Sequence, residues 1–166
     1  MPREVSGRIR LEIDLQERNT LVGDGTKTAV LAHQALRDKL ITNGVGDGQM
    51  DRVHSTALSV TTTPTDFDLA GSLSSAIGAG TTTFVDLSMI YIENTSTTGN
   101  LVVGGDANFV AFLGGATHTL TIPPGGVFFW EAPAGVTVVA ATGDILQIAA
   151  STGTVTGKMI VGGRSS

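Results

Sequence analysis

Cysteine is absent from the 166 residues of this chain, and aromatic side chains make up only 5% of it. Without cysteine there can be no disulfide framework and no thiolate metal site. No apolar run approaches the roughly 20 residues that a membrane-spanning helix needs, and residues 1–4 lack the apolar segment of a secretory signal peptide. The sequence therefore predicts no membrane partner and no Sec-type export, with stability coming from packing, hydrogen bonds and assembly.

Charge is also scarce, at 15% of the residues, against about a quarter in an average domain. Eight of the ten basic residues precede Ser55, together with eight acidic residues, so this part of the chain is mixed in charge. The rest of the chain contains two basic and seven acidic residues. Because binding to a phosphate backbone requires clustered Lys and Arg, no nucleic-acid partner is predicted.

The sequence is rich in short runs of β-branched and aromatic residues separated by Gly, Pro, Asn and Thr turns. This composition is typical of strands on a half-buried sheet. We expect strands at residues 53–61, 67–69, 84–93, 101–103, 109–113, 120–122, 127–130, 136–140, 145–149 and 155–161, and one helical turn at 72–77. Strands recurring every 8–12 residues predict an all-β, antiparallel, jelly-roll-like β-sandwich.

The region before this domain has a different pattern. In residues 8–16, Ile9, Leu11, Ile13 and Leu15 alternate with polar residues, which predicts a strand of the protein's own sheet or one added to a neighbour's sheet edge. Residues 28–40 contain good helix formers and favour a short helix. The glycine-rich segment 43–48 then suggests a boundary between an N-terminal arm, residues 1–45, and a sandwich domain, residues 46–166.

No residue pattern in the chain indicates a catalytic, cofactor or metal site. His33, His54 and His118 lack the paired spacing of a zinc site. The glycine pairs lie between strand-like runs with no Lys after them, so we interpret them as turns rather than phosphate loops. Asp66 and Asp68 provide too few close oxygen ligands for a calcium loop and indicate a solvated strand face.

The aromatic cluster at residues 128–130 allows two interpretations. The three rings could form a sugar-stacking platform, or one ring could lie in the core and its neighbours at a subunit interface, which we favour. The residues that we assign to the core or to such an interface are Ile90, Ile92, Val102, Phe128 and Trp130.

Three segments, IENTSTTGNLVVGG, TLTIPPGGVFFWEAP and ATGDILQIAASTGTVTGKMIVGG, together resemble a group of small virion proteins of tailed bacteriophages. These are the β-sandwich capsid auxiliary proteins, also called decoration, cement or minor capsid proteins. The resemblance covers residues 46–163 and rests on the ENTS turn, the PPGG turn and the late GD-L-I strand. These motifs are structural and identify no site.

The resemblance implies a non-enzymatic protein without cofactors that is made in the host cytoplasm and sits on the virion. It would bind the major capsid protein on the outside of the head and bridge capsomers as a homotrimer. Residues 1–43 depart from the shorter members, so the added arm could be the anchor. The residues that we expect to contact the capsid or another subunit are Arg3, Arg8, Ile9, Arg10, Leu11, Ile13 and Leu15.

Two other functions remain open at this stage. One is a phage tail or tail-tip β-domain that holds host glycan through residues 128–130 or surface loops. The other is a glycan hydrolase, which would need two carboxylates facing each other across the fold. Its candidates are isolated in the sequence, and nothing in the sequence positions them together: Asp86, Glu93, Glu131 and Asp144.

Overall fold

The computed structural model describes residues 4–20, 28–71, 73–74 and 80–166, with side chains in the first two strands described for residues 7–13 and 35–41. The chain forms two compact units. Ser6–Ile41 is one unit, and Met1–Val5 together with Thr42–Ser166 is the other. We call the first unit the hairpin and the second the sandwich.

The hairpin consists of β1 (Gly7–Thr20) and β2 (Thr28–Ile41), which pair antiparallel along their whole length, from Gly7 opposite Ile41 to Thr20 opposite Thr28. The expected helix at residues 28–40 is therefore wrong. Helix propensity is a weak preference that tertiary context overrides, and an isolated helix of this length is only marginally stable. Pairing with β1 instead gives the backbone of β2 an inter-strand hydrogen-bonding ladder.

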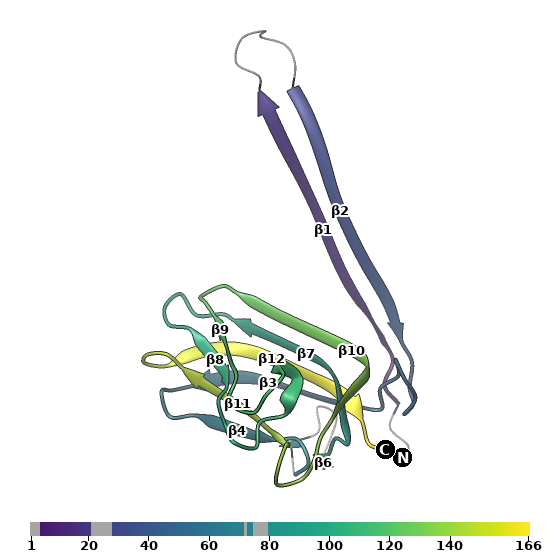
Figure 1. The fold of residues 1–166 in the computed structure, drawn as a ribbon, viewed down its shortest axis with the longest axis vertical. Coiled ribbons are helices and arrows are strands. Elements are labelled where there is room, and N and C mark those ends of the chain that lie inside the picture. The colour runs from purple at the N-terminus through teal and green to yellow at the C-terminus, as the bar shows by residue number, and fades with distance from the viewer. Residues whose placement is uncertain (1–3, 21–27, 72, 75–79) are drawn as a thin grey trace. The chain divides into compact units, whose positions relative to one another are not determined.

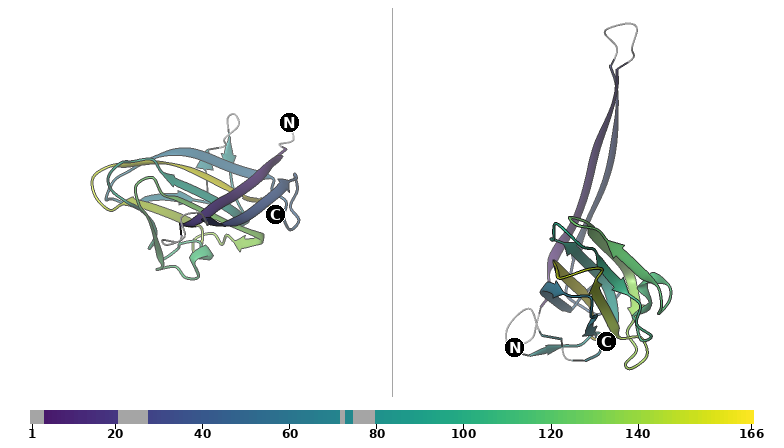
Figure 2. Two further views of the ribbon diagram at one scale, coloured as in Figure 1. Left: turned by 90° about the horizontal axis from the view of Figure 1, so that it is seen from above. Right: turned by 90° about the vertical axis from the view of Figure 1, so that its left-hand side faces the viewer.

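The sandwich contains two four-stranded sheets packed against each other (Figure 1). Sheet one has, in spatial order, β10 (Val127–Thr137), β7 (Asp86–Asn94), β12 (Val155–Arg164) and β3 (Arg52–Val60). Sheet two has, in spatial order, β4 (Thr65–Asp68), β11 (Ile145–Ala150), β8 (Leu101–Gly104) and β9 (Thr119–Ile122). Figure 2 shows both sheets from two further directions.

Every strand pair within these sheets is antiparallel. Counted along the chain as first to eighth, the strands are ordered 6-3-8-1 in sheet one and 2-7-4-5 in sheet two. This is the order produced by folding two sheets from interlocking Greek keys, which defines a jelly roll. The expected all-β, jelly-roll-like sandwich is confirmed.

Three local predictions need correction. Residues 109–113 are not a strand, because Phe109 forms an isolated bridge and Ala111–Leu113 is a 3-10 turn, η1, which Gly114 ends in the left-handed region at φ 92°. Residues 136 and 137 belong to β10, which resumes pairing with β7 after an irregularity. Leu73–Ser74 is β5, paired with β6 (Thr81–Thr82), and the rest of the expected helical turn at 72–77 lies outside the described residues.

The core lies between the two sheets and consists mainly of branched aliphatic side chains. In β7, Ile90 and Ile92 are completely buried, and so is Leu87. Strict alternation would place Leu87 and Ile90 on opposite faces, but the register shifts between Gly162 and Gly163 of the paired strand β12. Such an irregularity inserts an extra residue and re-aims the side chains that follow, so both residues face inward.

Candidate interaction surfaces

The two strands of the hairpin place different side chains on its two faces. Directly paired residues share a face. Ile9, Leu11 and Ile13 of β1 are paired with Lys39, Arg37 and Ala35 of β2, and these six residues form what we call the aliphatic face. Arg8, Arg10 and Glu12 are paired with Leu40, Asp38 and Leu36, and these six form the mixed face.

Both faces of the hairpin carry exposed apolar side chains. On the aliphatic face Leu11 is 46% exposed and Ile13 is 43% exposed. On the mixed face Leu36 and Leu40 are each 64% exposed. The sequence predicted one apolar and one polar face for β1 alone, and that alternation holds. The leucines of β2 add apolar side chains to the polar face of β1. Which residues of β2 share that face depends on the pairing register, and the register could not be predicted without knowing the partner strand.

The charges on the mixed face pair with one another. The Arg8 Nε lies 3.1 Å from Asp38 Oδ1, and the Arg10 Nη2 lies 2.6 Å from Glu12 Oε2. These side chains are solvent-exposed, so each pair contributes at most about 1 kcal/mol to stability. On the aliphatic face the described charged residues, Arg37 and Lys39, are both basic. The two faces therefore differ in electrostatic character.

The structure separates the residues predicted to make contacts. Arg8 and Arg10 lie on the mixed face, whereas Ile9, Leu11 and Ile13 lie on the aliphatic face. Leu15 is paired with His33, but its side chain is outside the described part of the hairpin, and Arg3 is outside the described residues altogether.

The predicted core or interface residues of the sandwich also divide into groups. Ile90 and Ile92 are completely buried, whereas Val102 is half-buried on β8 between the buried Leu101 and Val103. Phe128 and Trp130 pack against the core. Their rings lie 6.1 and 5.6 Å from that of Phe112 in η1. Such tilted contacts are the usual arrangement of packed aromatic rings, and they place both side chains in the interior packing rather than on a sugar-stacking platform.

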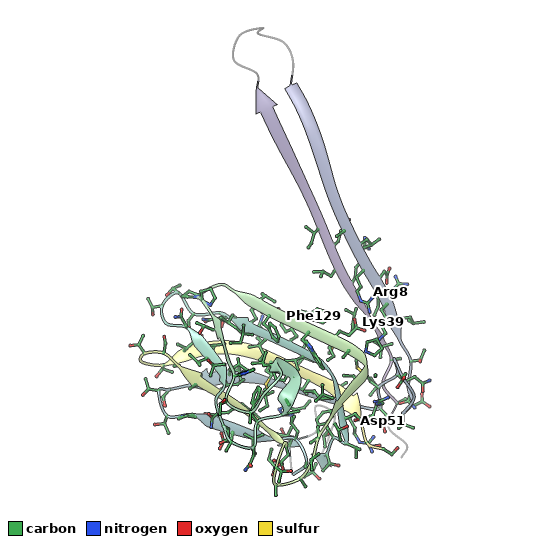
Figure 3. The ribbon with its side chains drawn as sticks, viewed as in Figure 1. Arg8, Lys39, Asp51 and Phe129 are labelled. Atoms are coloured by element: carbon green, nitrogen blue, oxygen red, sulfur yellow. The ribbon has the colours of Figure 1, made fainter. Side chains whose placement is uncertain are left out.

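The outward surface of sheet one carries a row of apolar side chains. Phe129 of β10 is paired with Tyr91 of β7, which is paired with Ile160 of β12 (Figure 3 labels Phe129). All three side chains are half-buried. Val127, which precedes Phe129 by two residues and shares its face, is 57% exposed. We define the outer face as these four residues together with the charged side chains beside them: Glu93, Glu131 and Lys158.

The outward surface of sheet two is more polar. Val102 is paired there with Ala149 and Thr121 on the neighbouring strands. Close by, Gln147 Nε2 donates a hydrogen bond to Asp66 Oδ1 over 2.8 Å. The sequence analysis assigned Ile90 and Ile92 to the core or an interface but gave Tyr91 no place, and so it missed the aromatic outer face of sheet one. The alternation of side chains along a strand could have identified this face. Ile90 and Ile92 are buried, so Tyr91 between them must point to the other side of the sheet.

Tyr91 is tied to the charged part of the outer face. Its hydroxyl donates to Glu93 Oε2 over 3.1 Å, and Glu93 Oε2 also lies 3.6 Å from Lys158 Nζ. Burial raises the pKa of the Tyr91 phenol above its ordinary value, and the hydrogen bond to the Glu93 carboxylate and its negative charge raise it further. Ionised Tyr91 would be repelled by Glu93, so the phenol stays protonated at neutral pH.

The isolated carboxylates considered for hydrolysis form structural contacts on separate elements. Asp86 Oδ2 lies 3.0 Å from Nη2 of the buried Arg164, whose Nη1 is 3.0 Å from Asp47 Oδ1. Asp144 accepts a hydrogen bond of 2.7 Å from the Ala141 N–H, and Glu93 accepts from Tyr91 as above. The arrangement pairs these carboxylates with nearby groups of the fold and does not place Asp86, Glu93 and Asp144 around a common point.

The histidines and the aspartates of β4 also have local roles. His54 is buried at 3% exposure, and its Nδ1 lies 2.8 Å from the Ser74 carbonyl oxygen. The Nδ1 of the exposed His118 lies 2.9 Å from the Leu113 carbonyl oxygen. His33 lies in β2, with its side chain outside the described part. Asp66 and Asp68 are exposed on β4, as expected for a solvated strand face.

Within the described ranges, no group of three or more His, Asp or Glu side chains is placed to hold a metal ion. The described residues also include no helix long and apolar enough to cross a bilayer. No protein-family model, curated protein or solved structure matches this chain. The outer face and the two faces of the hairpin are therefore the surfaces from which a function can be argued.

Proposed function

We propose that this chain is a structural virion protein that binds the outside of an assembled tailed-phage head. There it stabilises the lattice by bridging capsomers. The observation that carries the proposal is the hairpin, a ribbon of two 14-residue strands with exposed apolar side chains on both faces. A two-stranded ribbon is at best marginally stable alone in water, so such an element is suited to burial between other surfaces.

A capsid lattice presents protein surfaces at regular intervals, and a ribbon with two apolar faces can pack where such surfaces meet. Open strand edges can add backbone pairing with a neighbour. The major capsid protein and further copies of this chain are the proposed partners, with a homotrimer as the bridging form. The proposal requires no cofactor and no catalytic step.

The jelly roll is compatible with this function without deciding it. The same architecture occurs in viral capsid domains, in lectins and in cupins, and one fold hosts many functions. The tail-tip alternative was based on a glycan platform at residues 128–130. Because Phe128 and Trp130 pack against the core, the structure offers that alternative no specific support.

The proposal can be tested by binding purified protein to heads of the encoding phage that lack it. Replacing Leu36 and Leu40 with Asp removes two exposed apolar side chains from the mixed face. If each leucine contributes about 1–2 kcal/mol on burial, the affinity for heads falls about 30- to 1000-fold. The matched control is Thr63→Asp, which adds charge at an exposed turn of the sandwich and leaves binding unchanged.

Immunogold labelling of intact virions locates the protein independently. Label over the head supports the proposal, whereas label confined to the tail contradicts it and favours the tail alternative. Unchanged head binding by the Leu36→Asp/Leu40→Asp variant would show that the hairpin is not the anchor.

A further inference from the structure

We propose that residues 42–51, which we call the root segment, form a latch that opens while the jelly roll stays folded. The root segment belongs to the sandwich unit and is the stretch of chain between β2 of the hairpin and β3 of the jelly roll. Opening converts the attachment of the hairpin into a tether. The latch does not depend on the proposed function, because it requires no phage head and can be measured on the purified protein.

One apolar side chain anchors the root segment outside the core. Met50 is 2% exposed, yet it does not belong to the buried cluster between the two sheets. It lies against Gly162 of β12, where an added Cβ would be 2.7 Å from the Met50 sulfur and 3.4 Å from Cε of Met89. Gly162 shares the outward side of sheet one with Ile160, because the two are two residues apart on one strand. Release of Met50 therefore does not require the core to open.

A buried arginine provides the charged part of the latch. The Nη1 of Arg164 lies 3.0 Å from Oδ1 of Asp47 in the root segment. Its Nη2 lies 3.0 Å from Asp86 Oδ2 and also donates to the Ala134 carbonyl oxygen. The Asp47 side chain is 77% exposed, whereas that of Asp86 is 20% exposed. Opening thus returns an already hydrated Asp47 to water, while Arg164 keeps Asp86 and the Ala134 carbonyl as partners.

Asp51, labelled in Figure 3, fixes the end of the root segment to β12. Its Oδ1 accepts from the Ser165 N–H over 2.9 Å, and its Oδ2 lies 3.0 Å from Nη1 of Arg52. Its own N–H donates to the Gly163 carbonyl oxygen over 3.2 Å. These bonds continue the ladder in which Arg52 is paired with Gly163. The hinge of the latch is therefore at Asp51, and the residues before it are the moving part.

The moving part has few backbone bonds to the jelly roll. The Gly48 N–H donates to the Pro133 carbonyl oxygen over 2.9 Å, with Gly48 in the left-handed region at φ 76°. Other backbone bonds of the segment are internal, such as that from the Met50 N–H to the Thr42 carbonyl oxygen. Segments with few contacts to the core open at a lower free energy than the whole domain. Released, ten residues reach over at most about 35 Å.

Oxidation of methionine by hydrogen peroxide reads the latch and the core separately in one molecule. Peroxide transfers an oxygen atom to the sulfur, which gives methionine sulfoxide and water. Met50 reports on the latch, whereas Met159, which is completely buried in the core cluster, reports on unfolding of the jelly roll. Peptide mass spectrometry over time gives both rates. We expect Met50 to be oxidised roughly tenfold faster than Met159, and equal rates would overturn the proposal.

The variant Asp47→Asn tests whether the pair with Arg164 closes the latch. Loss of an ion pair with one exposed partner shifts the opening equilibrium roughly fivefold, so the Met50 rate should rise by that factor and the Met159 rate should not change. The matched control is Asp66→Asn, which removes the same charge from β4 and keeps an oxygen that can accept from Gln147. An unchanged Met50 rate in Asp47→Asn, or an equal rise at Met159, would refute the latch.

Amide hydrogen exchange provides a second measurement that needs no substitution. The Gly48 and Met50 amides are hydrogen-bonded in the closed latch, so they exchange only when it opens. We expect them to exchange faster than the paired amides of β7 and β12, and to respond to Asp47→Asn by the same factor as Met50 oxidation. Exchange of all these amides at one common rate would show that the root segment opens only with the whole domain. Loss of head binding would refute the proposed function and leave these outcomes unaffected.

Discussion

Asn94 lies in the ENTS turn, and its side chain connects three segments of the sandwich. Its Nδ2 donates to the carbonyl oxygens of Gly99 and Ile122, each over 3.0 Å, and its Oδ1 accepts from the Ser96 N–H over 3.1 Å. The residue is completely buried, and the hydrogen bond to Ile122 is buried as well. We predict that Asn94→Ala is strongly destabilising because it leaves these backbone groups without partners.

The magnitude follows from the number and burial of the lost bonds. The buried Ile122 carbonyl loses its partner at a penalty of about 1–3 kcal/mol. The Gly99 carbonyl and the Ser96 N–H are part-buried and can recover water, so each adds about 0.5–1.5 kcal/mol. The free energy of unfolding should fall by about 2–6 kcal/mol, a large part of the 5–15 kcal/mol that stabilises a typical domain. At about 2–4 °C per kcal/mol for a chain of this size, Tm falls by roughly 4–24 °C.

Urea unfolding followed through the single tryptophan, Trp130, measures this change directly. The control is Asn100→Ala in the same loop, where the backbone N–H of Asn100 bonds to Ser151 Oγ and survives the substitution. We expect the control to lie within about 0.5 kcal/mol of wild type. Equal unfolding midpoints for Asn94→Ala and Asn100→Ala would refute the assignment of Asn94 as the residue that holds the turn.

Two further predictions concern β7 and β12. Tyr91 is the chain's single tyrosine, so absorbance titration should show its pKa above the ordinary 10.0, and Glu93→Gln should lower it; an unchanged pKa in Glu93→Gln would contradict the role of the carboxylate. Because the Tyr91 pKa is higher in the folded state than in the unfolded state, the protonated phenol stabilises the fold. This stabilisation is fully present below pH 10 and is lost as the pH rises through the folded pKa. A Cβ at Gly157 would lie 2.4 Å from the Glu93 carbonyl oxygen, whereas one at Gly143 meets nothing closer than 4.0 Å. Gly157→Ala should therefore lower stability by about 1–3 kcal/mol and Gly143→Ala should not, as urea unfolding can show; equal losses would contradict the steric explanation.

The sandwich was largely predictable because its strands have a local signal. In β11 and β12 short apolar and β-branched runs lie between glycine turns, and the expected segments lie within the observed strands. The fold class could be predicted but the order of the strands could not, because strand pairing depends on contacts between residues far apart in sequence. The 3-10 turn at Ala111–Leu113 was missed because Phe109 and Phe112 are both buried and their three-residue spacing was overlooked.

The hairpin shows the opposite case. The alternation of Ile9, Leu11 and Ile13 identified β1, but β2 reads Ala-Val-Leu-Ala-His-Gln-Ala-Leu and contains strong helix formers. Only its pairing with β1 makes it a strand, and that pairing is non-local information. The faces of the hairpin, and with them the separation of Arg8 from Leu11, depend on the register and could not be derived before the partner strand was known.

The segregation of charge between the two units bears on how copies can associate. The sandwich, with four basic and ten acidic residues, has a net charge of −6 and repels another sandwich, whereas the hairpin, with six basic and five acidic residues, has a net charge of +1. The hairpin carries no such excess of one charge, and its exposed leucines and isoleucine are apolar, so an association that uses the hairpin avoids this repulsion. Salt screens exposed charges beyond a Debye length of about 8–10 Å, so added salt should weaken the repulsion between sandwiches and leave the burial of apolar side chains in place.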